Sequence, residues 1–194
     1  MMKRAILLFG YPGSGKGTQG KVLSALPGFE HVAMGDILRS LTPAHPLYEA
    51  IQSYVRRGNL VPDDLVMDLF TLYIQQLGNG PNDLLVIDGI PRNARQVERL
   101  REVVNVIKIF KLSVYDENIV IDRIRRRARA QNRPDDASDE VIRHRLSVYR
   151  TETEACTTAY PGTILTRIQA NQPVFDVHLD IIHALGKMRD IHFQ

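Results

Sequence analysis

Residues 10–18 read Gly10-Tyr11-Pro12-Gly13-Ser14-Gly15-Lys16-Gly17-Thr18, and the five residues before them, Ala5-Ile6-Leu7-Leu8-Phe9, are all apolar. An apolar run that leads into glycines predicts a buried strand, a tight turn and the start of a helix. Glycines let the backbone curl until several N–H groups point at one anion, and the helix N-terminus adds partial positive charge. Lys16 supplies a charge that can reach the β- and γ-phosphates of a nucleotide. The stretch therefore predicts a phosphate-binding loop.

The position after the lysine departs from the commonest form of this loop. It is Gly17, and the hydroxyl follows one residue later, at Thr18. In most such loops a serine or threonine directly after the lysine binds magnesium. We therefore expect Mg²⁺ to be held mainly by the nucleotide and water. The competing interpretation is a chance glycine turn with one lysine, and the strand–loop–helix order argues against it.

Length and composition place the chain among ordinary globular proteins. Its 194 residues fit one domain, with 44% hydrophobic and 24% charged residues. The N-terminal apolar run is short and lacks a cleavage pattern, so we expect no signal peptide and no membrane span. The single cysteine, Cys156, excludes an intrachain disulfide and a four-cysteine zinc site. We expect a cytoplasmic protein.

The net charge of +3 is mild, but arginines gather in the third quarter of the chain. Three interpretations compete: a solvated helix face, a nucleic-acid surface, or a cage for phosphorylated small molecules. Aromatic residues do not interleave the cluster as they would in a groove for single-stranded nucleic acid, so we expect no nucleic-acid partner. The cluster consists of Arg123, Arg125, Arg126, Arg127, Arg129, Arg133, Arg143, Arg145 and Arg150.

Apolar segments alternate with amphipathic ones along the chain, which is typical of an α/β fold with a parallel sheet and helices on both faces. The predicted strands are 5–9, 31–33, 84–87, 106–112 and 164–168. The predicted helices are 16–26, 47–57, 64–77, 94–103, 117–129, 139–159 and 175–189. We expect a five-stranded sheet in one domain over residues 1–194.

Two segments interrupt the alternation of strands and helices. Residues 33–61 form an excursion of short helices, and residues 130–136 form a polar loop between two helices. Ligands of α/β proteins bind beyond the carboxyl ends of the strands, where such excursions lie. Both segments have few apolar residues, so we expect them to move relative to the sheet.

A second strand-to-loop motif reads Leu85-Val86-Ile87-Asp88-Gly89-Ile90-Pro91-Arg92, with Gln96 four residues later. A carboxylate at the end of a buried strand indicates a functional or structural role for that residue. Helix capping and surface exposure are the structural alternatives. The functional interpretation is that Asp88 orders the water shell of Mg²⁺ while Arg92 binds a phosphate.

Together these motifs resemble the adenylate kinase family, and the resemblance covers nearly the whole chain. Besides the two motifs above, it rests on Gly35-Asp36-Ile37-Leu38-Arg39, Gly58-Asn59-Leu60-Val61-Pro62, Asp122-Arg123 through Arg127, Arg133-Pro134-Asp135-Asp136 and Arg145-Leu146. The loop around Arg133 is short and has no cysteine. The resemblance thus implies a short-lid member, with an acceptor segment at 33–61, a lid at 126–136 and no zinc.

The resemblance also assigns roles residue by residue. The ATP-binding residues would be Gly13, Ser14, Gly15, Lys16, Gly17, Thr18, Arg123, Arg127 and Gln172. The AMP-binding residues would be Met34, Arg39, Asn59, Leu60, Val61, Gly89, Arg92, Gln96, Arg133 and Arg145. The residues that act on the transferred phosphoryl group would be Lys16, Arg92, Arg127, Arg133 and Arg145, with Asp88 bound to Mg²⁺ through water.

The implied reaction is MgATP + AMP ⇌ 2 ADP in a monomer, with no membrane partner. Phosphoryl transfer depends on positioning and charge stabilisation, which suits arginines because a guanidinium contacts two phosphate oxygens at once. A general base is not required, because the attacking monophosphate is already ionised. This favours a cage over a solvated face for the arginine cluster.

Two positions leave the acceptor open. Ala33-Met34 stands where the family usually has Ser-Thr, and Asn93 stands where UMP/CMP kinases have an asparagine that binds the pyrimidine. Gln96 is the adenylate kinase residue, so we expect AMP, with a UMP/CMP kinase as the alternative. A more remote alternative is a nucleotide-binding switch without acceptor kinase activity. Such a switch would need a magnesium-binding hydroxyl directly after the lysine, where this chain has Gly17.

Overall fold

The computed structural model describes residues 2–77, 84–131, 136 and 138–188. Within them a five-stranded sheet has the order β2-β3-β1-β4-β5, and every neighbouring pair is parallel. The strands are β1 (Lys3–Gly10), β2 (Phe29–Ala33), β3 (Leu84–Asp88), β4 (Val104–Ser113) and β5 (Leu165–Gln169). All five predicted strands are present, and the predicted α/β class with a parallel sheet is confirmed.

The helices divide between the two faces of the sheet because side chains of a strand alternate in direction. Ala5, Leu7 and Phe9 of β1 pack in one core, and Ile6 and Leu8 pack in the other. The first core includes α2 (Met34–Ser40), α3 (Tyr48–Arg57), α4 (Asp63–Gln76) and α5 (Ala94–Val103). The second includes α1 (Lys16–Leu23) and α8 (Val174–Gly186).

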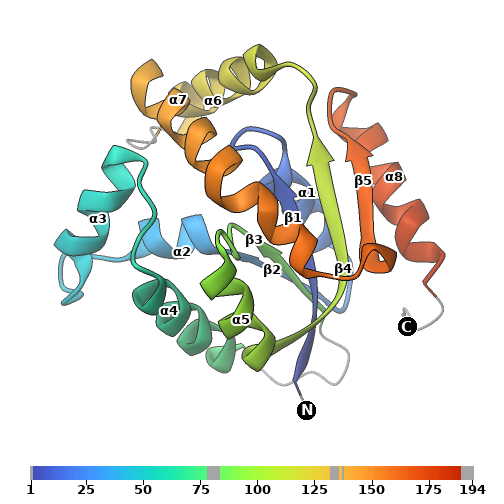
Figure 1. Cartoon of the computed structure of the whole chain (residues 1–194), viewed down its shortest axis with the longest axis horizontal. Helices are drawn as coiled ribbons and strands as arrows, with labels where there is room; N and C mark the ends of the chain where they lie inside the picture. Colours follow the sequence, from blue (N-terminus) through green and yellow to red (C-terminus); the bar gives the residue numbers. More distant parts are fainter. Residues whose placement is uncertain (1, 78–83, 132–135, 137, 189–194) are drawn as a thin grey trace.

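Two further helices, α6 (Glu117–Gln131) and α7 (Asp139–Val148), lie side by side at the top of the molecule in Figure 1, beyond the end toward which β4 points. They share a small core of their own, formed by Val120, Ile121, Ile124, Ile142 and Leu146. Because this core is separate from those of the sheet, the pair α6–α7 is attached as a unit above the carboxyl ends of the strands.

The predicted single helix 139–159 is wrong in its second half. After α7 the chain widens into a π-helical segment, η2 (Tyr149–Thr153), and then tightens into a 3₁₀ segment, η3 (Glu154–Ala159). Hydroxyls compete for backbone carbonyls here: Thr151 donates to Ser147 O and Thr157 donates to Glu154 O. Three helix types thus follow one another where the sequence pattern predicts one regular helix.

Other helix boundaries differ by a few residues. The helix predicted to run to Leu26 ends at Leu23, where the Ser24 hydroxyl donates to Lys21 O. The helix predicted at 117–129 extends to Gln131, and a one-turn 3₁₀ segment, η4 (Gly162–Ile164), precedes β5. In the described part of the chain, no helix combines the length and apolar character that crossing a membrane requires.

Candidate nucleotide-binding site

The loop between β1 and α1 forms an anion-binding turn. Gly13 and Gly15 have φ angles of 83° and 105°, which residues other than glycine rarely adopt. A Cβ on Gly13 would lie 2.7 Å from Val120 O, so only glycine lets the loop approach α6 this closely. Gly15 begins α1 and provides no side-chain cap, which leaves N–H groups of the first helical turn available to an anion.

The ammonium group of Lys16 lies inside this turn. Its Nζ donates to Gly10 O at 2.8 Å and to Tyr11 O at 3.0 Å, and it is 4.0 Å from Asp88 Oδ1. Burial lowers the pKa of Lys16 to about 8, Asp88 opposes the shift, and nearby Arg92, Arg127 and Arg145 add to it. One carboxylate and three arginines act on Lys16, so the net charge around it is positive, and a polyphosphate would balance it.

A cleft of about 700 Å³ extends from this loop across the carboxyl ends of the strands. It is lined by glycines and a hydroxyl of the loop together with basic side chains of α2, α6 and α7. All nine residues predicted to bind ATP lie along it: Gly13, Ser14, Gly15, Lys16, Gly17, Thr18, Arg123, Arg127 and Gln172. Arg126 and Gln131 also line it, and the sequence analysis did not select them.

Arg123 and Gln172 are far apart in the sequence, but both lie at one end of the cleft. Arg123 donates from Nη1 to Ala170 O at 2.9 Å, which holds its guanidinium beside the end of β5. Gln172 donates from Nε2 to Asp180 Oδ2 at 2.6 Å, so its side chain is directed to α8. Arg123, Ala170 and Gln172 therefore lie together at this end of the cleft, with the Arg123 guanidinium bonded to the backbone just after β5.

Arg127 and Arg145 are joined by a carboxylate that the sequence analysis did not select. Arg127 donates to Asp136 Oδ2 from Nε at 2.9 Å and from Nη2 at 2.7 Å, and Arg145 donates from Nη1 to Asp136 Oδ1. The Asp136 side chain is fully buried. It thus fixes two guanidinium groups from α6 and α7 at the edge of the cleft. The only sequence signal was the pair Asp135-Asp136 after Arg133.

Asp88 lies at the end of β3 on the floor of the cleft, with its side chain 16% exposed. A Cβ on Gly17 would be in van der Waals contact with Asp88 Oδ2, at 3.5 Å. A serine or threonine at position 17 would therefore lie beside this carboxylate. The described residues contain no group of three or more histidine, cysteine or acidic side chains able to hold a metal by themselves. One carboxylate suits an ion whose other ligands are phosphates and water.

A smaller hollow of about 50 Å³ lies between α2, α3 and α5. Every predicted AMP-binding residue in the described part of the chain lines it: Met34, Arg39, Asn59, Leu60, Val61, Gly89, Arg92, Gln96 and Arg145. Arg133, which was predicted for the same group, lies outside the described residues. Arg92 also lines the large cleft, and its Nε donates to Gly89 O at 2.7 Å. The two hollows therefore meet at Arg92.

Gln96 and Asn93 differ in how they face the small hollow. Gln96 is 1% exposed and lines it. Asn93 is the N-cap of α5: its Oδ1 accepts from Gln96 N at 2.9 Å, and its Nδ2 donates to Asp63 Oδ1 at 2.8 Å. Asn93 is absent from the residues that line the hollow. Its amide is thus engaged at both ends away from the site.

The predicted acceptor segment touches α7. The imidazole of His144 donates from Nε2 to Asn59 Oδ1 at 2.7 Å. A Cβ on Gly58 would lie 2.8 Å from Arg145 Cγ, so the backbone of residue 58 lies directly against α7. These contacts narrow the small hollow.

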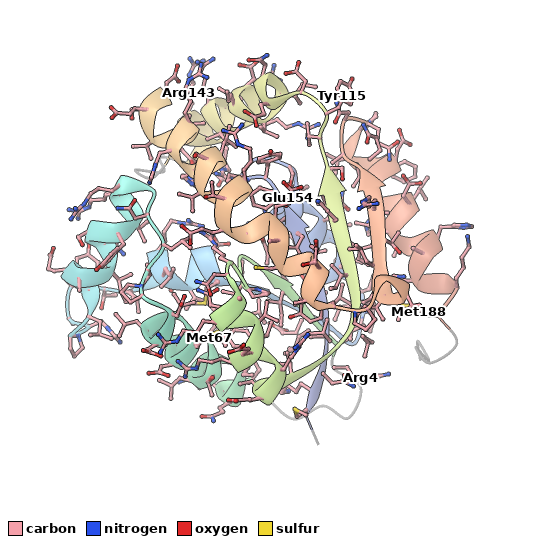
Figure 2. All side chains as sticks on the ribbon, in the orientation of Figure 1. Arg4, Met67, Tyr115, Arg143, Glu154 and Met188 are labelled. Carbon is pink, nitrogen blue, oxygen red and sulfur yellow. The ribbon has the colours of Figure 1, made fainter. Side chains whose placement is uncertain are left out.

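Three further arginines of the cluster, Arg125, Arg143 and Arg150, are not among the residues that line the cleft. Arg143 lies on the outer side of α7 at the top of the molecule (Figure 2). Arg125 pairs with Asp139, and Arg150 pairs with Glu117 at 2.8 Å. Among the described residues, Arg123, Arg126, Arg127 and Arg145 line the cleft, whereas Arg125 and Arg150 form exposed ion pairs outside it. Helical periodicity separates the two sets because α6 presents one side to the sheet.

Comparison with known proteins agrees with this geometry. The family model described as adenylate kinase matches residues 8–164. An adenylate kinase of Prochlorococcus marinus is 36% identical over 191 residues, which are 95% of this chain and 98% of that protein. An adenylate kinase of Thermus thermophilus is 34% identical over 190 residues, 94% of this chain and 97% of that protein. This chain belongs to the adenylate kinase family.

Proposed function

We propose that this enzyme transfers the γ-phosphoryl group of MgATP reversibly to AMP and yields two molecules of ADP. ATP would occupy the large cleft with its phosphates on the loop 10–18, and AMP would occupy the small hollow. Arg92 lines both and would contact the phosphates where they meet. Family membership favours this enzyme over a nucleotide-binding switch, and so does Gly17 in place of a magnesium-binding hydroxyl.

Catalysis in this proposal comes from positioned positive charge. The AMP phosphate is ionised at neutral pH and attacks without a general base. Lys16, Arg92, Arg127 and Arg145 would stabilise the charge on the equatorial oxygens as the phosphoryl group passes between the nucleotides. Their positions are held before substrate arrives, by Gly10 O for the lysine and by Asp136 for two arginines. Arg133 is proposed for the same group from the family resemblance.

Mg²⁺ carried with ATP would neutralise charge between the β- and γ-phosphates. Asp88 is the side chain that would hold its water shell, because it lies beside Gly17 on the floor of the cleft. We propose no zinc, since the chain has one cysteine and that thiol is buried.

The proposal treats residues 33–61 as an acceptor segment and residues 126–136 as a short lid, of which 132–135 lie outside the described residues. The separate core of α6 and α7 supports a lid that moves as one piece. The contact between His144 and Asn59 supports closure of the acceptor segment onto α7. Closure would exclude water, so that ATP is not hydrolysed.

One chain lines both hollows, so we propose a monomer. We place this monomer in the cytoplasm, where a free thiol such as Cys156 persists.

AMP is preferred over UMP and CMP in this proposal because Gln96 lines the small hollow and Asn93 does not. A glutamine amide offers a donor and an acceptor, the pattern that matches N1 and the N6 amino group of adenine. Asn93, the residue on which the pyrimidine alternative depends, is occupied by the start of α5 and by Asp63.

Two matched variants test this choice. Gln96→Ala should lower kcat/KM for AMP at least about tenfold and leave the KM for ATP unchanged, because it leaves polar groups of the base unpaired. Asn93→Ala is the comparison, and circular dichroism should show that both variants fold. If Gln96→Ala retains the wild-type kcat/KM for AMP while Asn93→Ala loses activity on CMP or UMP, the assignment of AMP is wrong and the UMP/CMP kinase alternative stands.

A further inference from the structure

We infer that Asp63 is a positioning residue that sets the orientation of the Gln96 amide and thereby selects the base of the acceptor nucleotide. The inference rests on the proposed function, in which Gln96 contacts the acceptor base. Asp63 is the first residue of α4 and does not line the acceptor hollow. It would therefore act through Gln96 and not by touching the substrate.

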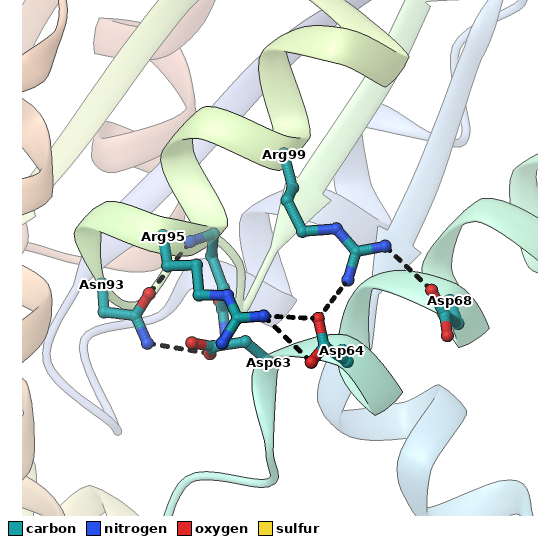
Figure 3. Close-up of polar contacts among 7 residues, drawn as sticks. Asp63, Asp64, Asp68, Asn93, Arg95 and Arg99 are labelled. Atoms are coloured by element: carbon teal, nitrogen blue, oxygen red, sulfur yellow. Dashed lines mark hydrogen bonds and ion pairs between the residues drawn. The ribbon is translucent and has the colours of Figure 1, made fainter.

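One oxygen of Asp63 accepts two hydrogen bonds from the following helix. Gln96 Nε2 donates to Asp63 Oδ1 at 2.7 Å, and Asn93 Nδ2 donates to the same oxygen at 2.8 Å. Figure 3 shows Asp63 at the start of α4, joined to Asn93 at the start of α5. The Asn93 bond holds the carboxylate in place, and the Gln96 bond transmits that position to the acceptor hollow.

The other end of the Gln96 amide is fixed by the backbone. Arg92 N donates to Gln96 Oε1 at 2.8 Å. A backbone N–H only donates and a carboxylate only accepts, so the amide has Oε1 toward Arg92 and Nε2 toward Asp63. Rotating it by 180° would place donor against donor and acceptor against acceptor. Asp63 and the Arg92 backbone therefore hold the two ends of the amide, and without Asp63 the amide would be held at Oε1 alone.

This orientation distinguishes purines by their N1 edge. Each end of the amide has capacity for one more bond, and no other described residue takes it: an N–H on Nε2 and a lone pair on Oε1. Adenine offers an acceptor at N1 and a donor at N6, which this pair satisfies. Hypoxanthine and guanine offer a donor at N1 and an acceptor at O6, which would need the rotated amide. The fixed amide thus favours AMP and opposes IMP and GMP.

The chain provides a matched control in the next residue. Asp64 also lies in the first turn of α4 and also bridges to α5, where it pairs with Arg95 and Arg99 at 2.9 Å (Figure 3). It has no bond to Gln96. Replacing Asp64 removes a carboxylate from the same helix N-terminus and breaks contacts between the same two helices. Asp64→Ala therefore reports the structural cost of such a loss without disturbing the amide.

The experiment measures kcat/KM for AMP and for IMP in the wild type, D63A, D63N and D64A, with thermal unfolding of each variant as the check of folding. IMP is the probe because it differs from AMP only at the N1 and C6 edge. We expect D63A to lower the AMP-to-IMP ratio by about tenfold, through a higher KM for AMP, with the KM for ATP unchanged. D63N should restore the ratio, because the asparagine carbonyl can accept both bonds, and D64A should match the wild type.

Two results would overturn the inference. One is a D63A enzyme with the wild-type ratio, and the other is an equal fall of the ratio in D63A and D64A, which would indicate a purely structural effect. The wild type is assayed with CMP and UMP in the same series. A wild type that uses either better than AMP refutes the proposed function itself, whereas an AMP preference that survives in D63A refutes only the role of Asp63.

Discussion

Asp136→Asn tests whether the arginines above the cleft depend on a buried carboxylate. The Asp136 side chain is fully buried, while the side chains of Arg127 and Arg145 are 27% and 15% exposed. Asparagine keeps the shape of aspartate but replaces one oxygen by an NH₂ group. One arginine then retains a neutral acceptor, and the other faces a donor. Two guanidinium groups also remain near each other without a counter-charge.

The geometry sets the expected magnitude. Removing one partner of a buried ion pair costs about 3–5 kcal/mol, and we expect about 2–3 kcal/mol here because solvent reaches part of both arginines. For a domain of this size that lowers the Tm by about 4–12 °C. The rate should suffer more than the stability, since a misplacement of about 1 Å in a charged positioning group can cost about 100-fold in kcat.

The assay follows ADP formation at saturating ATP and AMP, at a temperature where all variants are folded. The thermal unfolding of each variant is measured in parallel. Asp139→Asn is the control, because Asp139 pairs with Arg125 on the outer surface of the same two helices. We expect the control to change kcat less than about twofold, as for an exposed, screened pair. A kcat within about threefold of wild type in Asp136→Asn would refute the argument that this carboxylate preorganises the site.

Three further predictions concern the phosphate loop and closure. Lys16→Ala should lower phosphoryl transfer by about 10³–10⁵ with the fold retained, and activity within about tenfold of wild type would remove Lys16 from the mechanism. Because burial lowers the pKa of Lys16 to about 8, the free enzyme is partly neutral at that position near pH 8, and a bound polyphosphate should recharge it. ATP binding should therefore take up protons and weaken as the pH rises above about 8. Calorimetry in buffers of different ionisation enthalpy measures this uptake, and the absence of proton uptake near pH 8 would contradict the prediction. His144→Ala removes the bond to Asn59 and should weaken binding of a mimic that joins two adenosines through phosphates by about three- to tenfold; an unchanged Kd would show that the contact is not part of closure.

The sequence was sufficient for the sheet and for the grouping of site residues. A short continuous apolar run such as 5–9 is typical of a buried strand, and the glycine-rich turn that follows it supports that assignment. The residues predicted for ATP line the larger cleft, and the described residues predicted for AMP line the smaller hollow. Their resemblance to one family placed Gln172 at the cleft, which local patterns alone do not indicate.

Other features depend on tertiary contacts and escaped prediction. The change from α7 to π-helical and 3₁₀ turns after Val148 lies in a stretch whose sequence pattern is that of one regular helix, so the pattern did not indicate it. Asp136 is one of many aspartates, and only the fold brings Arg127 and Arg145 to its two oxygens. The sequence presented Asn93 only as the pyrimidine-binding residue of the UMP/CMP kinase alternative, whereas its bonds to Gln96 N and Asp63 are those of a helix cap.

The central claim is that this enzyme passes a phosphoryl group between two nucleotides held in separate hollows, with AMP as the acceptor. The most direct measurement is ADP formation from MgATP by the wild type with no acceptor, with AMP, with CMP and with UMP. We predict rapid ADP formation with AMP, at two ADP per ATP consumed, little with CMP or UMP, and almost none with ATP alone. ADP formation from ATP alone at the same rate as with AMP, or faster transfer to CMP or UMP than to AMP, would contradict the account.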